Sequence, residues 1–332
     1  MIGEGRRDGP FVGRSSLGAR HRSGKTAGAV TVVMFSRFAD IPSMADRVLP
    51  LIINLAPTGM VPTKAMTPHV PLSPQEIVDD VGRCAELGAS IIHLHARDEQ
   101  GRPTTRPEYM APLVEGVRSV DPELVVCVTC SGRFATSVDE RAAVLDLTGT
   151  ARPDMASLTL GSNNFVQQAS VNAPDTIRGL AARMRERGIK PELEVFEPGM
   201  LTFGQYLAEK GLIEPPWYVN VLLGNLGTSP ATPGALASFL ALLPPESVFA
   251  VAGIGRFQIA ANLLGVASAG HVRVGLEDNI WWDRDRTALA TNAQLVGRVR
   301  RMADVAERPI ATRAETRALL GLARPAPVAQ VV

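Results

Sequence analysis

His93 and His95 are the residues of this sequence whose types and spacing point most directly to chemistry. They lie in the apolar run 89–95, which is typical of a buried β-strand. Alternate side chains of a strand point to the same face, so the two imidazoles converge on one spot. Imidazole is the commonest metal ligand in proteins, and two of them supply half of a tetrahedral zinc site. Taken alone, the pair is equally consistent with two hydrogen-bonded core histidines.

A second polar cluster occupies residues 271–279, again at the end of a short apolar run. It offers carboxylates as a third metal ligand, and the two clusters together favour a metalloenzyme. Arg273 and Asp278 in this cluster are a candidate electrophile and base. A guanidinium presents a planar fork to carboxylates, and an aspartate beside a metal can accept a carbon-bound proton. The alternative is a buried ion pair without a chemical role.

The composition is that of a globular domain with a sizeable core. A chain of 332 residues with 45% hydrophobic residues is long enough for one α/β barrel. A net charge of +1 gives no reason to expect nucleic acid or an anionic membrane as a partner, and no apolar stretch reaches the roughly 20 residues that span a bilayer. Three cysteines cannot form a disulfide framework, which fits a reducing cytoplasm. Cys127 and Cys130 lie three apart in a strand-like run, so their sulfurs face opposite sides and we interpret both as structural.

Residues 1–44 differ from the rest of the chain, because they are rich in Gly, Ser and Arg and poor in acidic residues. Such a composition resembles an organelle transit segment, but a clear amphipathic stripe is missing. We therefore expect one of two explanations. Either the segment is a disordered leader, or the assigned start is too early and the true start is Met34 or Met44. In neither case do we expect this segment to carry chemistry.

From Leu49 onward, strand-like runs alternate with helical patterns. The predicted strands cover residues 49–56, 90–96, 123–130, 154–160, 191–197, 217–223, 247–252 and 271–275. The clearest helical patterns cover residues 73–87, 174–187, 232–243 and 285–306. Eight strands, each followed by a helix, predict a single-domain (β/α)8 TIM barrel over residues 45–322, followed by a tail at 323–332. A doubly wound open sheet is the alternative, but it does not need eight evenly spaced units.

Polar residues gather at the carboxyl ends of the predicted strands, where barrel enzymes carry their active sites. These residues are Asn54, His93, His95, Thr129, Ser157, Glu194, Asn220 and Arg273. Glu192 and Glu194 alternate with apolar residues, and a barrel strand has no solvated face, so an inward glutamate needs a cation or a metal as partner. Structural strands would rarely carry so many polar ends, and the pattern predicts an enzyme.

A glycine-rich turn with Gly253 and Gly255, followed by Arg256, ends the seventh predicted strand. Its backbone amides are candidates for binding a cofactor phosphate, as loops near the seventh and eighth strands often do in this fold. Glycines also serve plain tight turns.

Five stretches of the chain resemble the β-keto acid cleavage enzymes, a family that includes 3-keto-5-aminohexanoate cleavage enzyme. These stretches lie at residues 56–59, 88–98, 191–200, 251–256 and 270–279. The last of them is highly specific. The resemblance extends over about residues 49–322 and leaves out only the leader and the final few residues.

The resemblance implies a zinc-dependent (β/α)8 barrel, usually a homotetramer, that converts a β-keto acid and acetyl-CoA into acetoacetate and a new acyl-CoA. By motif position, His93, His95 and Glu277 are the zinc ligands, Asp278 is the base and Arg273 is its partner. Positions that match substrate-binding residues are Thr129, Ser157 and Glu194. Zinc would polarise the keto acid and stabilise the enolate formed by proton abstraction. The enolate would attack the acetyl thioester, CoA would move to the keto carbon, and a retro-Claisen cleavage would release acetoacetate.

Two other classes of protein stay open. A metal-dependent amidohydrolase also starts from a His-x-His pair on a barrel strand, but it needs further histidines at strand ends. Apart from His271, the sequence has no histidine after His95. A non-catalytic metabolite-binding barrel would keep zinc for structure alone. Structural zinc normally fills all four positions with protein ligands, whereas three are found here.

The loop after the first strand bears on the choice of substrate. The aminohexanoate-cleaving family members carry an acidic residue there, which suits a substrate ammonium, and Val61 stands at that position in this chain. An ammonium buried against valine would lose its counter-charge, at a cost of several kcal/mol. Lys64 and Arg133 lie in loops expected to edge the pocket, and both repel cations. We therefore expect a neutral or anionic side chain on the keto acid and poor use of 3-keto-5-aminohexanoate, unless these two residues bind CoA phosphates or point into solvent.

Overall fold

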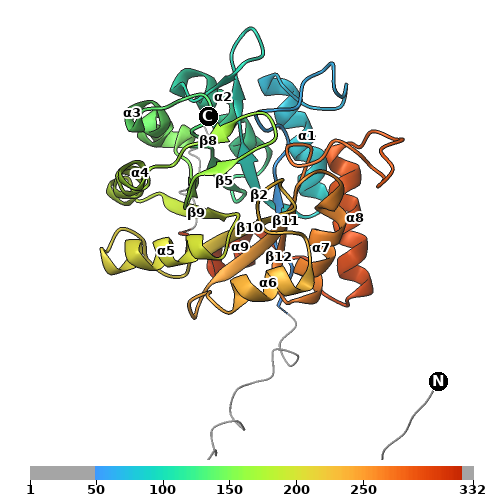
Figure 1. Ribbon diagram of the computed structural model, residues 1–332. Helices are drawn as coiled ribbons and strands as arrows, with labels where there is room; N and C mark the ends of the chain where they lie inside the picture. The colour runs from blue at the N-terminus through green and yellow to red at the C-terminus, as the bar shows by residue number, and fades with distance from the viewer. Residues whose placement is uncertain (1–48, 324–332) are drawn as a thin grey trace, which may run out of the picture. The chain divides into compact units, whose positions relative to one another are not determined.

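The computed structural model describes residues 49–323, so the expected leader at 1–44 and nearly all of the expected tail lie outside the described residues. Eight parallel strands form a closed barrel in the order β1-β12-β11-β10-β9-β6-β5-β2 (Figure 1). The strands are β1 (Ile53–Leu55), β2 (Ala89–Leu94), β5 (Val125–Val128), β6 (Met155–Thr159), β9 (Lys190–Val195), β10 (Tyr218–Leu223), β11 (Val248–Gly253) and β12 (His271–Val274). The predicted (β/α)8 barrel is thus confirmed, and the open sheet is excluded.

A helix follows each barrel strand, and the eight helices form a ring around the strands (Figure 1). They are α1 (Pro74–Glu86), α2 (Pro107–Val120), α3 (Val138–Ala142), α4 (Pro174–Glu186), α5 (Gly199–Glu209), α6 (Pro233–Leu240), α7 (Gln258–Ala267) and α8 (Asn292–Val305). The start of α1 shows why these helices form where they do. The Ser73 hydroxyl accepts the Glu76 backbone N–H at 3.3 Å, and the Glu76 carboxylate accepts the Ser73 N–H at 3.0 Å.

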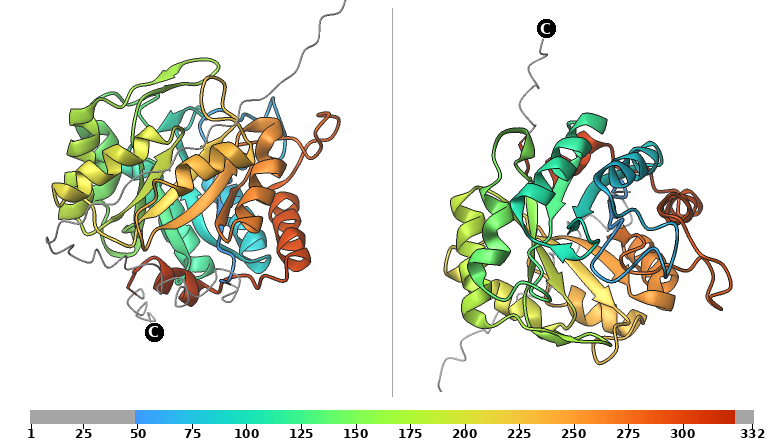
Figure 2. Two further views of the ribbon diagram at one scale, coloured as in Figure 1. Left: turned by 60° about the horizontal axis from the view of Figure 1, so that its bottom comes forward. Right: turned by 90° about the horizontal axis from the view of Figure 1, so that it is seen from above.

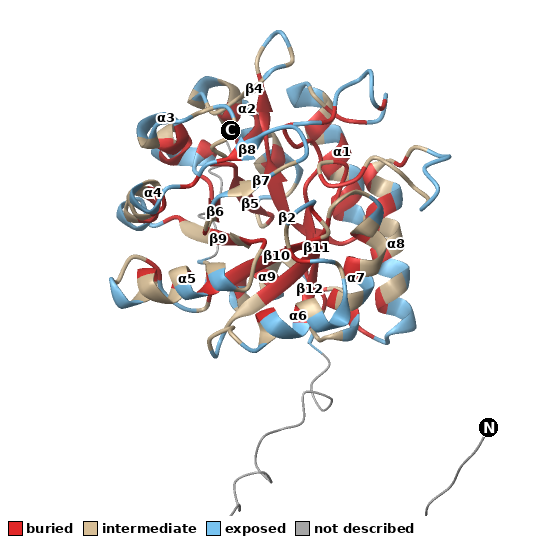
Figure 3. Cartoon of the chain, in the orientation of Figure 1, coloured by how far each residue is buried: buried red, intermediate tan, exposed pale blue. Residues whose placement is uncertain are grey.

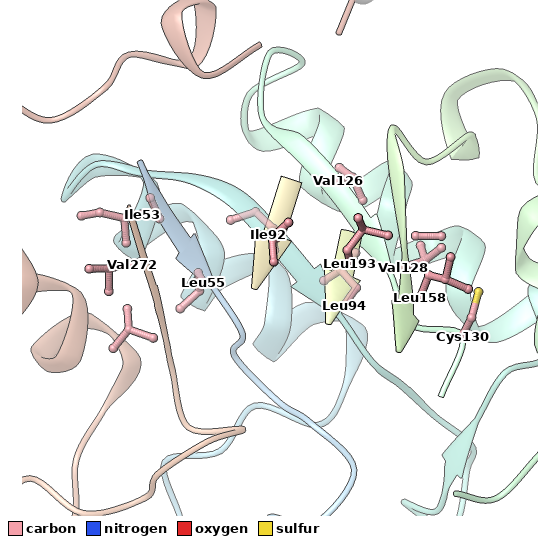
Figure 4. Packing of buried hydrophobic residues seen from close by; sticks show 14 of the residues in the cluster. Ile53, Leu55, Ile92, Leu94, Val126, Val128, Cys130, Leu158, Leu193 and Val272 are labelled. Carbon is pink, nitrogen blue, oxygen red and sulfur yellow. The ribbon is translucent and has the colours of Figure 1, made fainter. Parts of the chain in front are cut away.

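Side chains alternate between the two faces of each barrel strand. Ile53, Leu55, Ile92 and Leu94 belong to the large cluster that packs between the strands and the helix ring (Figure 4). Both faces of the strands are therefore buried, whereas the helices expose one side to solvent (Figure 3).

The two cysteines of the C-x-x-C sequence follow this alternation. Cys130 belongs to the outer cluster, whereas Cys127 belongs to a separate cluster inside the barrel. Their sulfurs face opposite sides, as predicted, and the pair does not form a metal site.

The amino-terminal end of the barrel is covered by a helix that the sequence did not predict, α9 (Arg313–Leu319) (Figure 2). Leu320, which follows it, packs on Ile52 and Ile91 inside the barrel. His271 begins β12 at this same end, and its Nδ1 accepts the Ile52 N–H at 3.0 Å. Burial, together with the positive charge of Arg308, lowers the pKa of His271 to about 3. His271 therefore holds β12 to β1 and is not part of the strand-end cluster in which the sequence had placed it.

The carboxyl-terminal end carries two small hairpins in the loops after β2 and β6. They are β3 (Ala96–Arg97) with β4 (Pro103–Thr104), and β7 (Asn163–Asn164) with β8 (Ala169–Ser170). Among the described residues, no helix has both the length and the apolar character needed to cross a membrane.

The predicted helix at 285–306 begins too early. The helix starts at Asn292, after a capping box in which Thr291 and Gln294 bond each other's backbone N–H groups. Upstream of it, the Asp283 carboxylate accepts the N–H groups of Thr287 and Ala288 at 3.0 and 2.7 Å. These local bonds compete with helix formation, so this segment is a loop.

Candidate active site

A cluster of two histidines and one glutamate lies at the carboxyl end of β2 and β12. His93 Nε2 lies 3.1 Å from His95 Nε2, and His95 Nε2 lies 3.2 Å from Glu277 Oε1. His93 Nε2 is 3.9 Å from the other carboxylate oxygen of Glu277. All three side chains are nearly inaccessible to solvent. The structure thus brings together the three residues that the family resemblance implies as metal ligands.

The spacing of these atoms fits a metal ion. Zinc bonds of 2.0–2.1 Å in a tetrahedral arrangement place neighbouring ligand atoms about 3.3 Å apart, close to the separations found here. Glu277 Oε2 is buried and has no hydrogen-bond partner among residues 49–323, although a buried carboxylate oxygen normally has one. The donor set of two imidazoles and one carboxylate also matches catalytic zinc, which keeps a fourth position open.

Glu192 fixes the orientation of His93. It lies two residues before Glu194 on β9, so both side chains point to the same face of the strand. Its Oε2 lies 2.6 Å from His93 Nδ1 and 3.1 Å from Cys127 Sγ. Its Oε1 accepts the side-chain amides of Asn54 at 2.8 Å and Asn220 at 2.6 Å. Because an ionised carboxylate only accepts, His93 carries its proton on Nδ1 and directs the lone pair of Nε2 toward the cluster.

His93 and Glu192 stabilise each other's charged forms. Burial alone would lower the pKa of His93, but the charge of Glu192 outweighs it and raises that pKa to about 8. Burial in turn opposes ionisation of Glu192, yet His93 lowers the pKa of this carboxyl to about 2. Burial lowers the pKa of His95, which favours the neutral form that a metal ligand requires. The sequence pattern showed that Glu192 points inward, but not that it bonds His93 rather than lining the site.

We expect Glu192→Gln to weaken metal binding by about 10- to 100-fold while the protein stays folded, because the amide keeps the shape but removes the charge that polarises His93. Competition with a chromophoric chelator measures this affinity. Glu197→Gln is the matched control, since Glu197 follows β9 and its carboxylate accepts the Ser229 hydroxyl at 2.9 Å rather than bonding His93. Equal affinities for the two variants would contradict the role of Glu192.

Arg273 on β12 joins three carboxylates. Its nitrogens lie 3.0 Å from Glu194 Oε1, 2.9 Å from Glu277 Oε1 and 3.2 Å from Asp278 Oδ2. Burial opposes the charge of Arg273, but these carboxylates raise its pKa well above the usual range, so it stays a guanidinium. Burial, with a contribution from Glu277, raises the pKa of Asp278, although Arg273 opposes the shift. A carboxylate with a raised pKa is a stronger base.

The loop that carries Glu277 is held by residues that sequence reasoning missed. A Cβ on Gly59 would lie 2.5 Å from Glu277 Cγ, so only glycine allows the β1 loop to pack here. The Asn292 side chain accepts the Leu276 N–H at 2.8 Å and donates to Asp80 at 2.6 Å. Gly59 lies in the family-like stretch 56–59, which was the one available signal.

A cavity of about 580 Å³ opens beside this cluster. Glu194, Arg273, Glu277 and Asp278 line it, as does Val61. The structure therefore brings together the predicted base, its arginine, one metal ligand and two of the predicted substrate-binding residues.

Thr129 and Ser157 lie behind the cavity rather than in its wall. The Thr129 hydroxyl accepts the Ser131 N–H at 3.2 Å, and the Ser157 hydroxyl accepts the Cys130 N–H at 3.0 Å. Both are buried, and they hold the loop that follows β5. Their contact with a substrate stays a prediction.

The glycine turn after β11 is built for packing. A Cβ on Gly253 would lie 2.4 Å from the Phe257 carbonyl oxygen, and the Gly255 N–H already donates to the Asp278 carbonyl at 2.7 Å. The amide of Gly255 is therefore engaged rather than open to a phosphate. The side chain of Arg256 contacts the Phe257 ring, and its binding of CoA stays a prediction.

Lys64 is exposed and does not line the cavity, although Val61 and Met66 of the same loop do. It pairs with Glu76 at 2.6 Å and donates to the Pro68 carbonyl at 3.3 Å, which matches the alternative that Lys64 points into solvent. Arg133, the other predicted cation, does line the cavity.

A closed parallel barrel with a candidate metal cluster, base and arginine at its carboxyl end defines a barrel enzyme, and comparison with known proteins gives its family. The model of the beta-keto acid cleavage enzyme family matches residues 50–322. The chain therefore belongs to the β-keto acid cleavage enzyme family.

Curated relatives and solved structures agree with this assignment. The chain is 36% identical over 276 residues to the 3-oxoadipate:acetyl-CoA acetyltransferase of Cupriavidus necator, covering 82% of this chain and 95% of the relative. It is 35% identical over 275 residues to the 3-keto-5-aminohexanoate cleavage enzyme of Acetoanaerobium sticklandii, covering 82% and 99%. The structure of ObcA with a C4-CoA adduct and oxalate has a TM-score of 0.68 at 19% identity, covering 78% of this chain and 68% of that chain, and it supports the fold alone.

Proposed function

We propose that this protein is a zinc-dependent β-keto acid cleavage enzyme that converts a β-keto acid and acetyl-CoA into acetoacetate and a new acyl-CoA. The observation that carries the proposal is that Asp278, held by Arg273, lines the same cavity as Glu277, which joins His93 and His95 in the candidate metal cluster. The names of the relatives support the same reaction class, since one is an acetyl-CoA acetyltransferase and another a keto acid cleavage enzyme.

In this proposal Asp278 removes a proton from C2 of the keto acid. Its raised pKa suits it to accept that proton, and Arg273 holds the carboxylate toward the cavity. A zinc ion held by His93, His95 and Glu277 would act as a Lewis acid on the keto acid oxygens.

The bond changes balance without a further reactant. C2 of the keto acid forms a bond to the acetyl carbonyl carbon, and the CoA thiolate leaves. The thiolate then bonds to C3, the C2–C3 bond breaks, and C2 regains a proton from Asp278. The products are acetoacetate and an acyl-CoA that carries the former side chain.

The two rival classes find less support. An amidohydrolase needs further histidines at the strand ends, but His271 lies at the opposite end of the barrel and bonds the Ile52 N–H. A purely structural zinc would be closed off by protein ligands, whereas Glu277 borders the cavity.

The relatives do not decide the substrate, because two of nearly equal identity are named for keto acids of opposite side-chain charge. The cavity wall is more informative. Val61 lines it and offers no counter-charge to an ammonium. We therefore infer a keto acid with a neutral or anionic side chain, and poor use of 3-keto-5-aminohexanoate. Assembly as a homotetramer and a cytoplasmic location also stay predictions.

An activity screen tests the proposed function. Purified protein with zinc is incubated with acetyl-CoA and a panel of β-keto acids, and acetoacetate and acyl-CoA are quantified together. We expect equal amounts of the two products, formed only when both substrates are present. A protein that binds keto acids without forming either product would be the metabolite-binding barrel instead.

A further inference from the structure

The charged residues of the cavity are unevenly paired. Three carboxylates and three guanidinium groups line it, and all three carboxylates contact Arg273. Of the other two cations, Arg286 lies at the exposed rim, where water screens its charge. Arg133 is half-buried, its Nε is inaccessible and has no hydrogen-bond partner, and it forms no ion pair within residues 49–323. The cavity therefore contains one partly buried cation without an anionic partner.

Arg133 is held in place by an aromatic ring. Its guanidinium carbon lies 4.3 Å from the centroid of Phe165, in the β7–β8 hairpin. Burial lowers the pKa of Arg133, and the charges of Glu277 and Glu194 oppose this shift, although neither carboxylate forms an ion pair with Arg133. The cavity lining also includes the apolar side chains of Met60, Val61, Met66, Phe134, Phe165 and Val166.

We propose that Arg133 binds the second carboxylate of a dicarboxylic β-keto acid and is the specificity-determining residue of this site. The inference rests on the proposed function, because the reacting carbons must lie beside Asp278 and Arg133 then meets the far end of the substrate. A planar guanidinium packed against an aromatic ring matches the geometry of a carboxylate. A partly buried cation without an ion-pair partner is also stabilised strongly when it binds an anion.

A matched pair of substrates tests this assignment. 3-Oxoadipate and 3-oxohexanoate have the same six-carbon chain, but the first ends in a carboxylate and the second in a methyl group. We expect the wild-type enzyme to have the higher kcat/KM for 3-oxoadipate. Arg133→Met should lower that value by roughly 10- to 100-fold, the effect of a lost hydrogen bond to a charged group, and change kcat/KM for 3-oxohexanoate by less than about 3-fold.

Two further variants separate recognition from general electrostatics. Arg286→Met removes a charge from the rim of the same cavity and should leave the substrate preference unchanged. Arg133→Lys keeps the charge but loses the fork, so we expect a several-fold loss on 3-oxoadipate alone. This variant carries the test if Arg133→Met does not fold, which zinc content and thermal unfolding reveal.

The outcomes that overturn the assignment are distinct. Equal losses on both substrates would mean that Arg133 binds the C1 carboxylate or CoA, and unchanged kinetics would mean that it binds neither. A wild-type enzyme that prefers 3-oxohexanoate would also overturn it. Absence of turnover with either substrate, and with every other keto acid of the panel, would instead refute the proposed function, and this inference with it.

Discussion

His95→Ala is expected to abolish metal binding and activity while the protein stays folded. Wild-type protein should contain about one zinc per chain, as a site with three protein ligands implies. Without His95, the remaining His93 and Glu277 atoms lie 3.9 Å apart and supply only two ligands. The side chain lies at the strand end rather than in the hydrophobic core, so circular dichroism should remain that of the wild type.

Elemental analysis of the purified variants measures the metal content. His69→Ala is the matched control, because His69 is exposed and lies outside the cavity, and this variant should keep both zinc and activity. His93→Ala should behave like His95→Ala. An unchanged zinc content in both His93→Ala and His95→Ala would contradict the assignment of these residues as metal ligands.

Asp278→Asn should keep zinc but lose turnover by roughly 10²-fold or more, the usual contribution of a general base. The amide preserves the size of the side chain beside Arg273, yet it cannot accept the C2 proton. The same variant should slow the exchange of the C2 protons of a β-keto acid in heavy water, followed by NMR and corrected for the rate without enzyme.

The exchange experiment separates a base from a structural residue. Asp285→Asn provides the control, since Asp285 is an exposed acid in the following loop. If Asp278→Asn exchanges C2 protons at the wild-type rate, Asp278 is not the base, whatever its effect on turnover.

The sequence predicted the barrel because its strands are buried on both faces. Apolar runs such as 124–128 distinguish such strands from loops, and eight strands alternate with helices. The missed features depend on contacts that no local pattern contains. Asp283 bonds the backbone of a segment with helical periodicity and makes it a loop, and α9 is defined by its packing under the barrel.

Within the site, the sequence predicted which side chains point into the barrel. It did not predict how far along the barrel each of them lies from the cavity. Glu192 and Glu194 share a face of β9, yet they lie roughly 6.6 Å apart along the strand. That distance places Glu192 behind His93 and Glu194 in the cavity wall. His271 shows the same limit, since it points inward at the wrong end of β12.

The two loop cations lie in different surroundings. Both follow barrel strands, β1 and β5, in loops that border the cavity, but Lys64 turns to Glu76 on α1. Arg133 lines the cavity together with Phe165, from a hairpin about 30 residues downstream, and its guanidinium carbon lies 4.3 Å from the centroid of that ring. Contacts between separate loops are set by tertiary structure, so spacing in the sequence does not predict them.

The fate of an isotopic label in the acetyl group tests the central claim most directly. The enzyme is supplied with acetyl-CoA carrying ¹³C in both acetyl carbons and with an unlabelled β-keto acid, and the products are resolved by NMR and mass spectrometry. The proposed reaction predicts that both labelled carbons appear at C3 and C4 of acetoacetate and that the new acyl-CoA is unlabelled. Label in the new acyl chain, or unlabelled acetoacetate formed without acetyl-CoA, would contradict the account.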